Sequence, residues 1–428
     1  MNFLIGLIKK TYKMAPLHER RIVMNNVAAL SILQTITYIL PILILPYVFR
    51  VIGAEKFGLI AFAQAFVQYF IILTDYGFNV SATKEISLCR DHHAKVCKAF
   101  SSVMTVKMIL AFFSLLALSI IVYFIPKFRN DWMVYIFSFG SVVGSTLFPV
   151  WFFQGTEKMK HIAELNIVGG IVYTFCILFL VREQQDYLMV PLINSCVSLI
   201  TGILAQRIIF RKFNISFKFQ GHKNFRRQLK AGWDIFISIA AINAYTSTRI
   251  FVIGLFTNNT LTGFYSIAEK IANACQTFPL WSFSQAIFPR LSAIFDRNKK
   301  KAFGIMLRIQ HITILISLIC LPLIFLFADG IVKVICGGNY PAVITSLRLL
   351  LIAVFFVSAN AFRVQFLLVC GKTQIYSRIH VMMAMVGLPL IVLLTYYFSY
   401  VGTAVATVVI EAGIFSITYM TLKGLRFH

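Results

Sequence analysis

Three ionisable residues lie in apolar sequence on either side of a short polar turn, residues 257–262. Arg249 precedes the turn, and Glu269 and Lys270 follow it at a nearly equal distance. At about 1.5 Å of rise per residue, a helical hairpin over residues 233–290 would hold all three at a similar depth in a bilayer. An ionised group there costs roughly 2.5 to 3.5 kcal/mol on insertion scales, so these residues predict a function.

The residue types at this depth suit an anionic cargo. Arg249 could bind a diphosphate through two parallel hydrogen bonds, and Lys270 could act on it as a point charge. Glu269 would then pair with Arg249 whenever the cargo is absent. The alternative is a permanent ion pair between Arg249 and Glu269 that locks the hairpin, and the sequence leaves both interpretations open.

Four further ionisable residues lie in or beside apolar segments: Asp75, Lys107, Arg363 and Glu411. Lys107 and Arg363 are further candidates for binding the anion, although long basic side chains can also extend to the membrane surface. Glu411 lies deep in its segment, where it is either a hydrogen-bonded structural group or a coupling site. Asp75 is a candidate charge partner.

The elements that hold these residues must be membrane-spanning helices. The chain has 428 residues, of which 59% are hydrophobic and 13% charged, and its mean hydropathy is +0.81. Apolar runs of helical length predict an all-α polytopic membrane protein. The twelve predicted spans cover 25–49, 57–78, 99–125, 132–153, 163–181, 187–209, 233–255, 263–288, 305–327, 341–369, 378–398 and 401–421.

The net charge of +25 is distributed unevenly along the chain. Lys and Arg concentrate on the amino-terminal segment and on alternate loops, above all in residues 210–232, which carry no acidic residue. By the positive-inside rule, both termini lie in the cytoplasm, as expected for a multi-pass protein of the bacterial inner membrane. The basic loops suit anionic lipids rather than nucleic acid. Lys9 and Lys10 follow the first apolar run, so no cleavable signal peptide is expected.

Neither a metal nor a cofactor is predicted. Cys89, His92, His93 and Cys97 share one basic loop, but their spacing matches no standard zinc pattern. Most of the other cysteines lie in apolar segments, where a free thiol behaves as a small hydrophobe.

A weak internal repeat divides the chain. Residues 58–66 resemble residues 263–271, so that Gln64 and Ala65 stand where the second copy has Glu269 and Lys270. The repeat predicts two six-helix lobes, residues 1–214 and 215–428. Because six is even, the lobes would be related by a parallel repeat about an axis along the membrane normal. The first lobe would then offer a polar wall, and the second would hold the anion.

The order and spacing of several short motifs are similar to those of the Wzx-type O-antigen and polysaccharide flippases, a family of the multidrug/oligosaccharidyl-lipid/polysaccharide exporter superfamily. The resemblance covers nearly the whole chain. It rests on residues 51–53 with 57–58, 75–79, 151–160, 263–266 and 288–292.

The resemblance implies two lobes around a central cavity that opens alternately to either side. It also implies an undecaprenyl-pyrophosphate-linked oligosaccharide as cargo, moved from the cytoplasmic to the periplasmic leaflet with ion coupling, and a polysaccharide polymerase as a partner. One alternative is a cation-coupled multidrug exporter of the same fold, which the intramembrane basic residues disfavour. Another is a membrane-embedded polymerase or glycosyltransferase, which the short outer loops disfavour. The sequence therefore predicts a transporter rather than an enzyme.

Overall fold

A computed structural model of the chain describes the backbone of residues 17–424. Side chains are described in that range except for residues 17–39, 41, 277–290, 292–293 and 296–297. Both termini, the side chains in the first part of the predicted span 25–49 and most side chains of the 288–292 motif therefore lie outside the described residues.

The described residues form helices joined by short connections, without a β-strand. This confirms the predicted all-α membrane fold. The helices of the first half are α2 (Leu17–Asp75), α3 (Phe78–Cys89), α4 (His93–Phe124), α5 (Pro126–Arg129), α6 (Trp132–Leu147), α7 (Val150–Gly155), α8 (Lys160–Leu180), η2 (Gln184–Leu188) and α9 (Met189–Lys212). Those of the second half are α10 (His222–Thr246), α11 (Thr248–Phe256), α12 (Asn259–Arg297), α13 (Lys299–Leu326), α14 (Ala328–Cys336), α15 (Pro341–Val369) and α16 (Thr373–Gly424).

Within the described part of the chain, eight helices are long and apolar enough to cross a membrane, or nine if α10 and α11 form one bent span. Two of these helices are interrupted. α2 breaks at Gly53, which has φ 76°, and α16 breaks at Ser399, which has φ 55°. Both breaks fall between consecutive predicted spans. Twelve spans and a repeated lobe stay predictions.

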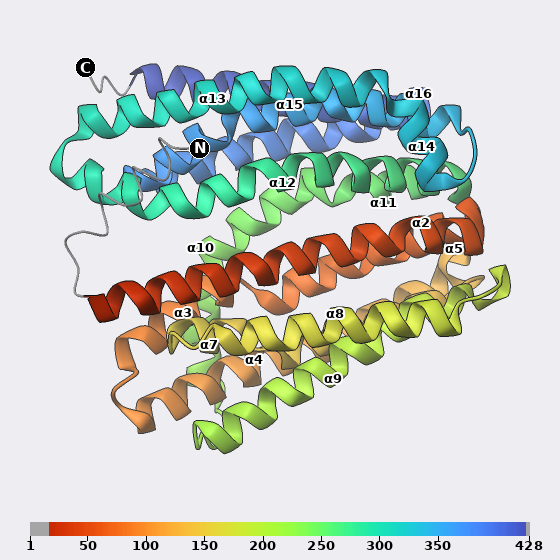
Figure 1. Cartoon of the computed structure of the whole chain (residues 1–428). Helices are drawn as coiled ribbons and strands as arrows, with labels where there is room; N and C mark the ends of the chain where they lie inside the picture. The colour runs from red at the N-terminus through yellow and green to blue at the C-terminus, as the bar shows by residue number, and fades with distance from the viewer. Residues whose placement is uncertain (1–16, 425–428) are drawn as a thin grey trace.

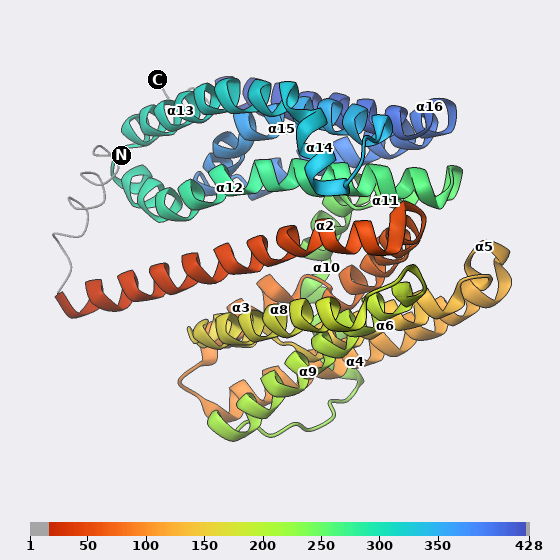
Figure 2. The ribbon, with the colours of Figure 1, turned by 45° about the vertical axis from the view of Figure 1, so that its right-hand side comes forward.

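The helices gather into two groups with roughly parallel axes (Figures 1 and 2). The first helix group consists of α2 to α9, and the second consists of α11 to α16. α10 runs obliquely between them, beginning beside α3 and α4 and ending beside α16. The two groups meet most extensively where α2 packs against α12.

Two glycines allow α2 and α12 to approach each other closely. A Cβ atom on Gly58 would lie 1.7 Å from the carbonyl oxygen of Asn259, and one on Gly263 would lie 2.2 Å from that of Ala54. These are the glycines that begin the two copies of the internal repeat. No larger residue fits at this crossing without moving one of the helices.

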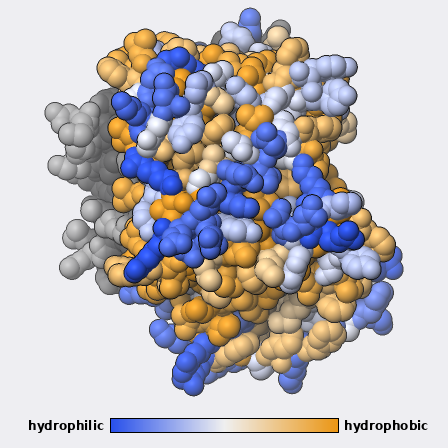
Figure 3. All heavy atoms as spheres, turned by 90° about the vertical axis from the view of Figure 1, so that its right-hand side faces the viewer, coloured by the Kyte–Doolittle hydropathy of each residue, from blue (hydrophilic) through white to orange (hydrophobic). Residues whose placement is uncertain are grey.

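Both helix groups contribute to the packing near the α2 break. Phe62 of α2 stacks on Phe251 of α11 with ring centroids 5.2 Å apart, and a continuous apolar cluster joins residues of both groups. We call this part of the molecule the Gly53 end. Figure 3 looks onto it and shows hydrophilic residues across the middle of the face, with hydrophobic residues around them.

Two basic residues of the first group connect it to the second at the Gly53 end. Arg50 donates hydrogen bonds to the carbonyl oxygens of Ile335, at 3.1 Å, and Val334 in the last turn of α14. Lys127 of α5 donates to Leu255, at 3.0 Å, and Gly254 near the end of α11. These carbonyls have no partner inside their own helices, and the negative end of a helix dipole favours a cation.

Candidate functional site

A polar cavity of about 510 Å³ lies inside the second helix group, between α10, α11, α12, α15 and α16. Four ionisable residues line it together with two tyrosines. They are Arg249, Glu269, His380, Glu411, Tyr245 and Tyr376. The cavity therefore collects charged side chains from helices that are far apart in the sequence.

Arg249 stands at a bend in the chain. α10 and α11 meet at an angle of 46° between Thr246 and Thr248, and Arg249 begins the next turn. Its Nε–H donates to the carbonyl oxygen of Thr246 at 2.9 Å. The bend thereby directs the guanidinium toward α12 and satisfies one of the carbonyls at the end of α10.

Arg249 and Glu269 form an ion pair across the cavity wall. The Nε atom of Arg249 lies 3.3 Å from Oε1 of Glu269, and the two side chains are only 13% and 11% exposed. Because the Nε hydrogen points to Thr246, Oε1 receives no hydrogen bond from any described residue. The contact is a charge pair with an unsatisfied carboxylate oxygen, which is a costly arrangement in a dry site.

Glu411 of α16 lines the same cavity and interacts electrostatically with Arg249. One guanidinium thus interacts electrostatically with two carboxylates. The structure brings together three residues that the sequence analysis selected on three separate segments: Arg249, Glu269 and Glu411.

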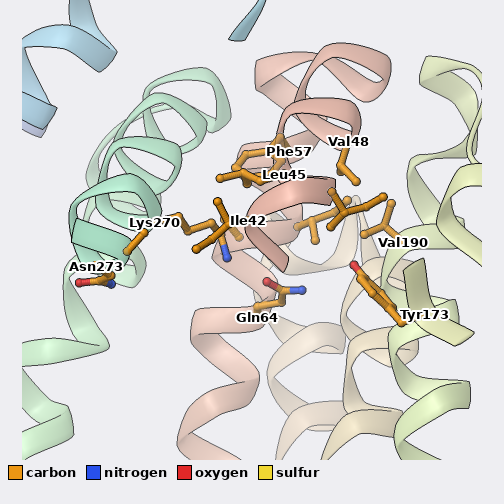
Figure 4. Close-up of a pocket in the computed structure, with 13 residues that line it drawn as sticks. Ile42, Leu45, Val48, Phe57, Gln64, Tyr173, Val190, Lys270 and Asn273 are labelled. Atoms are coloured by element: carbon orange, nitrogen blue, oxygen red, sulfur yellow. The ribbon is translucent and has the colours of Figure 1, made fainter. Parts of the chain in front are cut away.

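Lys270 faces a different cavity. Adjacent residues of an α-helix point about 100° apart, so Glu269 and Lys270 project from different faces of α12. Lys270 borders an apolar cavity of about 260 Å³ between α2, α8, α9 and α12. Figure 4 shows its side chain extending from α12 toward Ile42 of α2. Asn273, one turn further along α12, lines both cavities.

Arg363 lies outside the lining of both cavities. Its guanidinium stacks over the rings of Phe415 and Tyr419 of α16, 4.6 Å and 4.9 Å from their centroids. The residue is buried, and its Nη1 group has no hydrogen-bond partner among the described residues. Cation–π contacts stabilise the charge there while leaving a donor unused.

Lys107 and Asp75 form a separate ion pair in the first helix group. Lys107 Nζ lies 2.8 Å from Asp75 Oδ1 and also donates to the carbonyl oxygen of Ser145 at 3.3 Å. Asn79 donates to the other carboxylate oxygen at 3.1 Å. With a side chain only 1% exposed, Lys107 has its charge compensated within the first group.

His380 also lines the polar cavity, although it is not among the residues selected from the sequence. Its Nδ1 atom lies 2.8 Å from the hydroxyl of Tyr245, and its ring packs edge-on against Tyr376. The sequence does contain a signal for this residue: like the charged residues that were selected, it is an ionisable side chain inside an apolar segment.

The loop of Cys89, His92, His93 and Cys97 gives no metal cluster. Cys97 Sγ lies 3.8 Å from His93 Nδ1, but no group of three or more metal-ligating residues occurs among the residues that the structure describes.

Comparisons with known proteins agree with this architecture. The family model described as polysaccharide biosynthesis protein matches residues 23–295. A protein of Escherichia coli K12, described as a candidate O-antigen transporter, is 31% identical over 405 residues, which cover 94% of this chain and 96% of that protein. A protein of Shigella dysenteriae with the same description is 26% identical over 396 residues, covering 90% and 96%.

Among solved structures, the lipid II flippase MurJ in an inward closed conformation superposes with a TM-score of 0.75 at 12% identity, covering 92% of this chain and 87% of that one. This likeness shows the fold. The family match and the Escherichia coli relative both extend over most of the chain and confirm the resemblance to the Wzx-type flippases. The chain therefore belongs to the polysaccharide biosynthesis protein family.

Proposed function

We propose that this protein is a flippase that moves an undecaprenyl-pyrophosphate-linked oligosaccharide from the cytoplasmic to the periplasmic leaflet of a bacterial inner membrane. One observation carries the proposal: the adjacent residues Glu269 and Lys270 of α12 border a polar and an apolar cavity, respectively. A cargo with a polar head, an anionic link and a hydrocarbon tail needs both environments at one depth. The names of the relatives, O-antigen transporter and flippase, support the same cargo class.

Lys270 is the proposed first contact of the diphosphate. Among the described residues, its ammonium donates no hydrogen bond and forms no salt bridge. Glu269 attracts this ammonium electrostatically but makes no salt bridge with it, so an arriving anion would supply its first direct charge partner. Arg249 would follow as a second contact, because its guanidinium can bind two phosphate oxygens at once.

Glu269 and Glu411 are the proposed coupling residues. Oε1 of Glu269 lacks a hydrogen-bond donor in the described structure, so protonation there would remove a poorly compensated negative charge. Protonation would also weaken its attraction for Arg249 and free the guanidinium for the diphosphate. In this scheme a proton and a cargo anion occupy the same cavity together, and each favours the binding of the other.

The other candidates take secondary parts. Arg363, with its unused Nη1 donor, is proposed as an anion contact nearer the cytoplasmic side. Lys107 would have to leave Asp75 to bind cargo, so the geometry favours a structural role for this pair.

The proposed orientation places the Gly53 end at the periplasm and both termini in the cytoplasm. The concentration of basic residues in the 210–232 loop supports this orientation, because such loops stay in the cytoplasm and attract anionic lipids. The contacts of Arg50 and Lys127 would then close the periplasmic side, as in an inward-facing state. A polysaccharide polymerase remains the expected partner.

The test reconstitutes the full chain in proteoliposomes and follows the lipid-linked oligosaccharide between leaflets under an imposed proton gradient. The wild type should translocate it. Lys270→Gln and Arg249→Ala should lower the rate per folded protein, Arg249→Lys should recover part of it, and Glu269→Gln should abolish its dependence on the gradient. Export of a cationic drug without movement of the lipid would overturn the proposal.

A cation-coupled multidrug exporter is the second candidate. The polar cavity carries two carboxylates, Glu269 and Glu411, and one guanidinium. This excess of carboxylates suits a cationic cargo, even though the whole chain is strongly basic. The same proteoliposomes distinguish the two functions when they are loaded with a fluorescent cationic drug.

A further inference from the structure

The apolar cavity beside Lys270 has a composition that the movement of a sugar or a proton does not explain. Its walls are hydrocarbon from both parts of α2, with Ile42, Leu45 and Val48 before the Gly53 break and Phe57 and Ile60 after it. α8 and α9 close the far side with Tyr173 and Val190.

Among the lining residues the one charged group lies at the α12 side of this cavity, and the hydroxyl of Tyr173 lies at the opposite side. Lys270 and Asn273 reach it from α12, and Gln64 reaches it from α2 (Figure 4). A ligand that fills the cavity therefore meets hydrocarbon over most of its surface and a cation at one end. This pattern is complementary to an apolar chain that carries an anionic head.

The depth of Lys270 distinguishes a travelling lipid from a resident one. Lys270 lies about 16 Å along α12 from its start at Asn259, which is near the middle of a hydrocarbon core of about 30 Å. A resident phospholipid keeps its phosphate at the membrane surface. A lipid that is being flipped must bring its phosphate through this level.

We propose that the apolar cavity binds the first isoprene units of the polyprenyl carrier while Lys270 holds its diphosphate. A cavity of about 150 Å³ accepts benzene, which has six carbon atoms. By the same ratio, the cavity of about 260 Å³ has room for roughly ten carbon atoms, or about two isoprene units. The remainder of the tail stays in lipid. This inference rests on the proposed flippase function and adds the site that recognises the carrier, independent of the sugar it bears.

The test uses the full chain in nanodiscs and a probe without sugar, geranylgeranyl diphosphate with a diazirine on its second isoprene unit. After illumination, adducts should map to residues 42–48 and 57–61. Undecaprenyl diphosphate should compete with the probe, whereas phosphatidylglycerol should not. Lys270→Gln should weaken binding about tenfold, as expected for the loss of one charge-assisted contact.

Variants that fill the cavity make the test specific. Val48→Trp and Ile60→Trp should lower the adduct yield roughly tenfold, because an added ring occupies the space of the tail. Leu43→Trp is the matched control, because Leu43 is 67% exposed on the same helix. If the tryptophan variants fail to fold, Ala61→Leu replaces them with a smaller filling side chain.

The outcomes separate the two proposals. Adducts that survive filling of the cavity, or equal competition by phosphatidylglycerol, would overturn the carrier site. Flipping of the lipid-linked oligosaccharide without cavity adducts would also overturn it and leave the flippase function standing. Cavity adducts without flipping would support a prenyl diphosphate site and reject the flippase function.

Discussion

Arg249 is the one lysine or arginine that lines the polar cavity in the described structure, and two carboxylates interact with it. Removing it would deprive the buried Glu269 and the half-buried Glu411 of their guanidinium counter-charge. For a buried ion pair, removing one partner costs more stability than replacing both partners with uncharged residues. The arrangement therefore allows the structural and transport roles of Arg249 to be separated by a double variant.

Arg249→Ala should lower the free energy of unfolding by about 3 to 5 kcal/mol, because it strands a buried carboxylate. Adding Glu269→Gln should restore much of that loss. Thermal unfolding in detergent measures both effects. If the double variant is as stable as the wild type but moves the lipid more slowly than Glu269→Gln alone, Arg249 has a role in transport beyond the structural ion pair. If the double variant recovers both stability and transport, Arg249 and Glu269 form a permanent structural ion pair.

Lys107→Met should also destabilise the protein, but by less, roughly 1 to 3 kcal/mol, because Asp75 keeps its hydrogen bond from Asn79. The Asp75 side chain is 32% exposed, which further reduces the cost of losing its partner. Binding of a prenyl diphosphate should be unchanged. A clear loss of affinity in a folded Lys107→Met variant would place this lysine among the anion contacts.

At the scale of helices, the α2–α12 crossing depends on the absence of side chains. Gly58→Ala would bring a methyl group against the carbonyl oxygen of Asn259, so it should lower the unfolding temperature and separate the helices. Gly304→Ala is the control, because a Cβ atom there meets nothing within 4 Å and alanine favours a helix. Equal stability of the two variants would contradict the packing described at the crossing.

Arg50 and Lys127 connect the two helix groups through the carbonyl ends of α14 and α11. Arg50→Gln combined with Lys127→Gln should remove these charge-assisted bonds and raise the population of conformations open at the Gly53 end. Spin labels at Arg129 and Lys333, on a cysteine-free background that still transports, would report a longer distance. An unchanged distribution would show that the apolar packing around Phe62 and Phe251 is sufficient for closure.

For the whole molecule, the proposed orientation predicts opposite accessibility at the two ends. A cysteine at Lys299 should react with a membrane-impermeant thiol reagent only from the cytoplasmic side, and one at Arg129 only from the periplasmic side. Intact cells and inverted vesicles provide the two measurements. Labelling of both positions from the same side would contradict the assigned number of crossings.

The sequence alone determined the membrane class and the all-α fold. A chain this apolar can satisfy its backbone in lipid only through helices or a closed barrel, and its apolar runs have the length of spanning helices. It also selected Arg249, Glu269, Lys270 and Glu411 by their depth, since hydropathy along a helix reports position across the membrane. The resemblance carried by the ordered motifs correctly identified the family.

Only the tertiary structure decided what each of these side chains faces. The facing direction depends on the rotation of each helix about its axis and on its neighbours, which depth does not specify. Packing therefore brought Glu411 and the unselected His380 to Arg249, paired Lys107 with Asp75, and turned Lys270 away from Glu269 toward a hydrocarbon cavity.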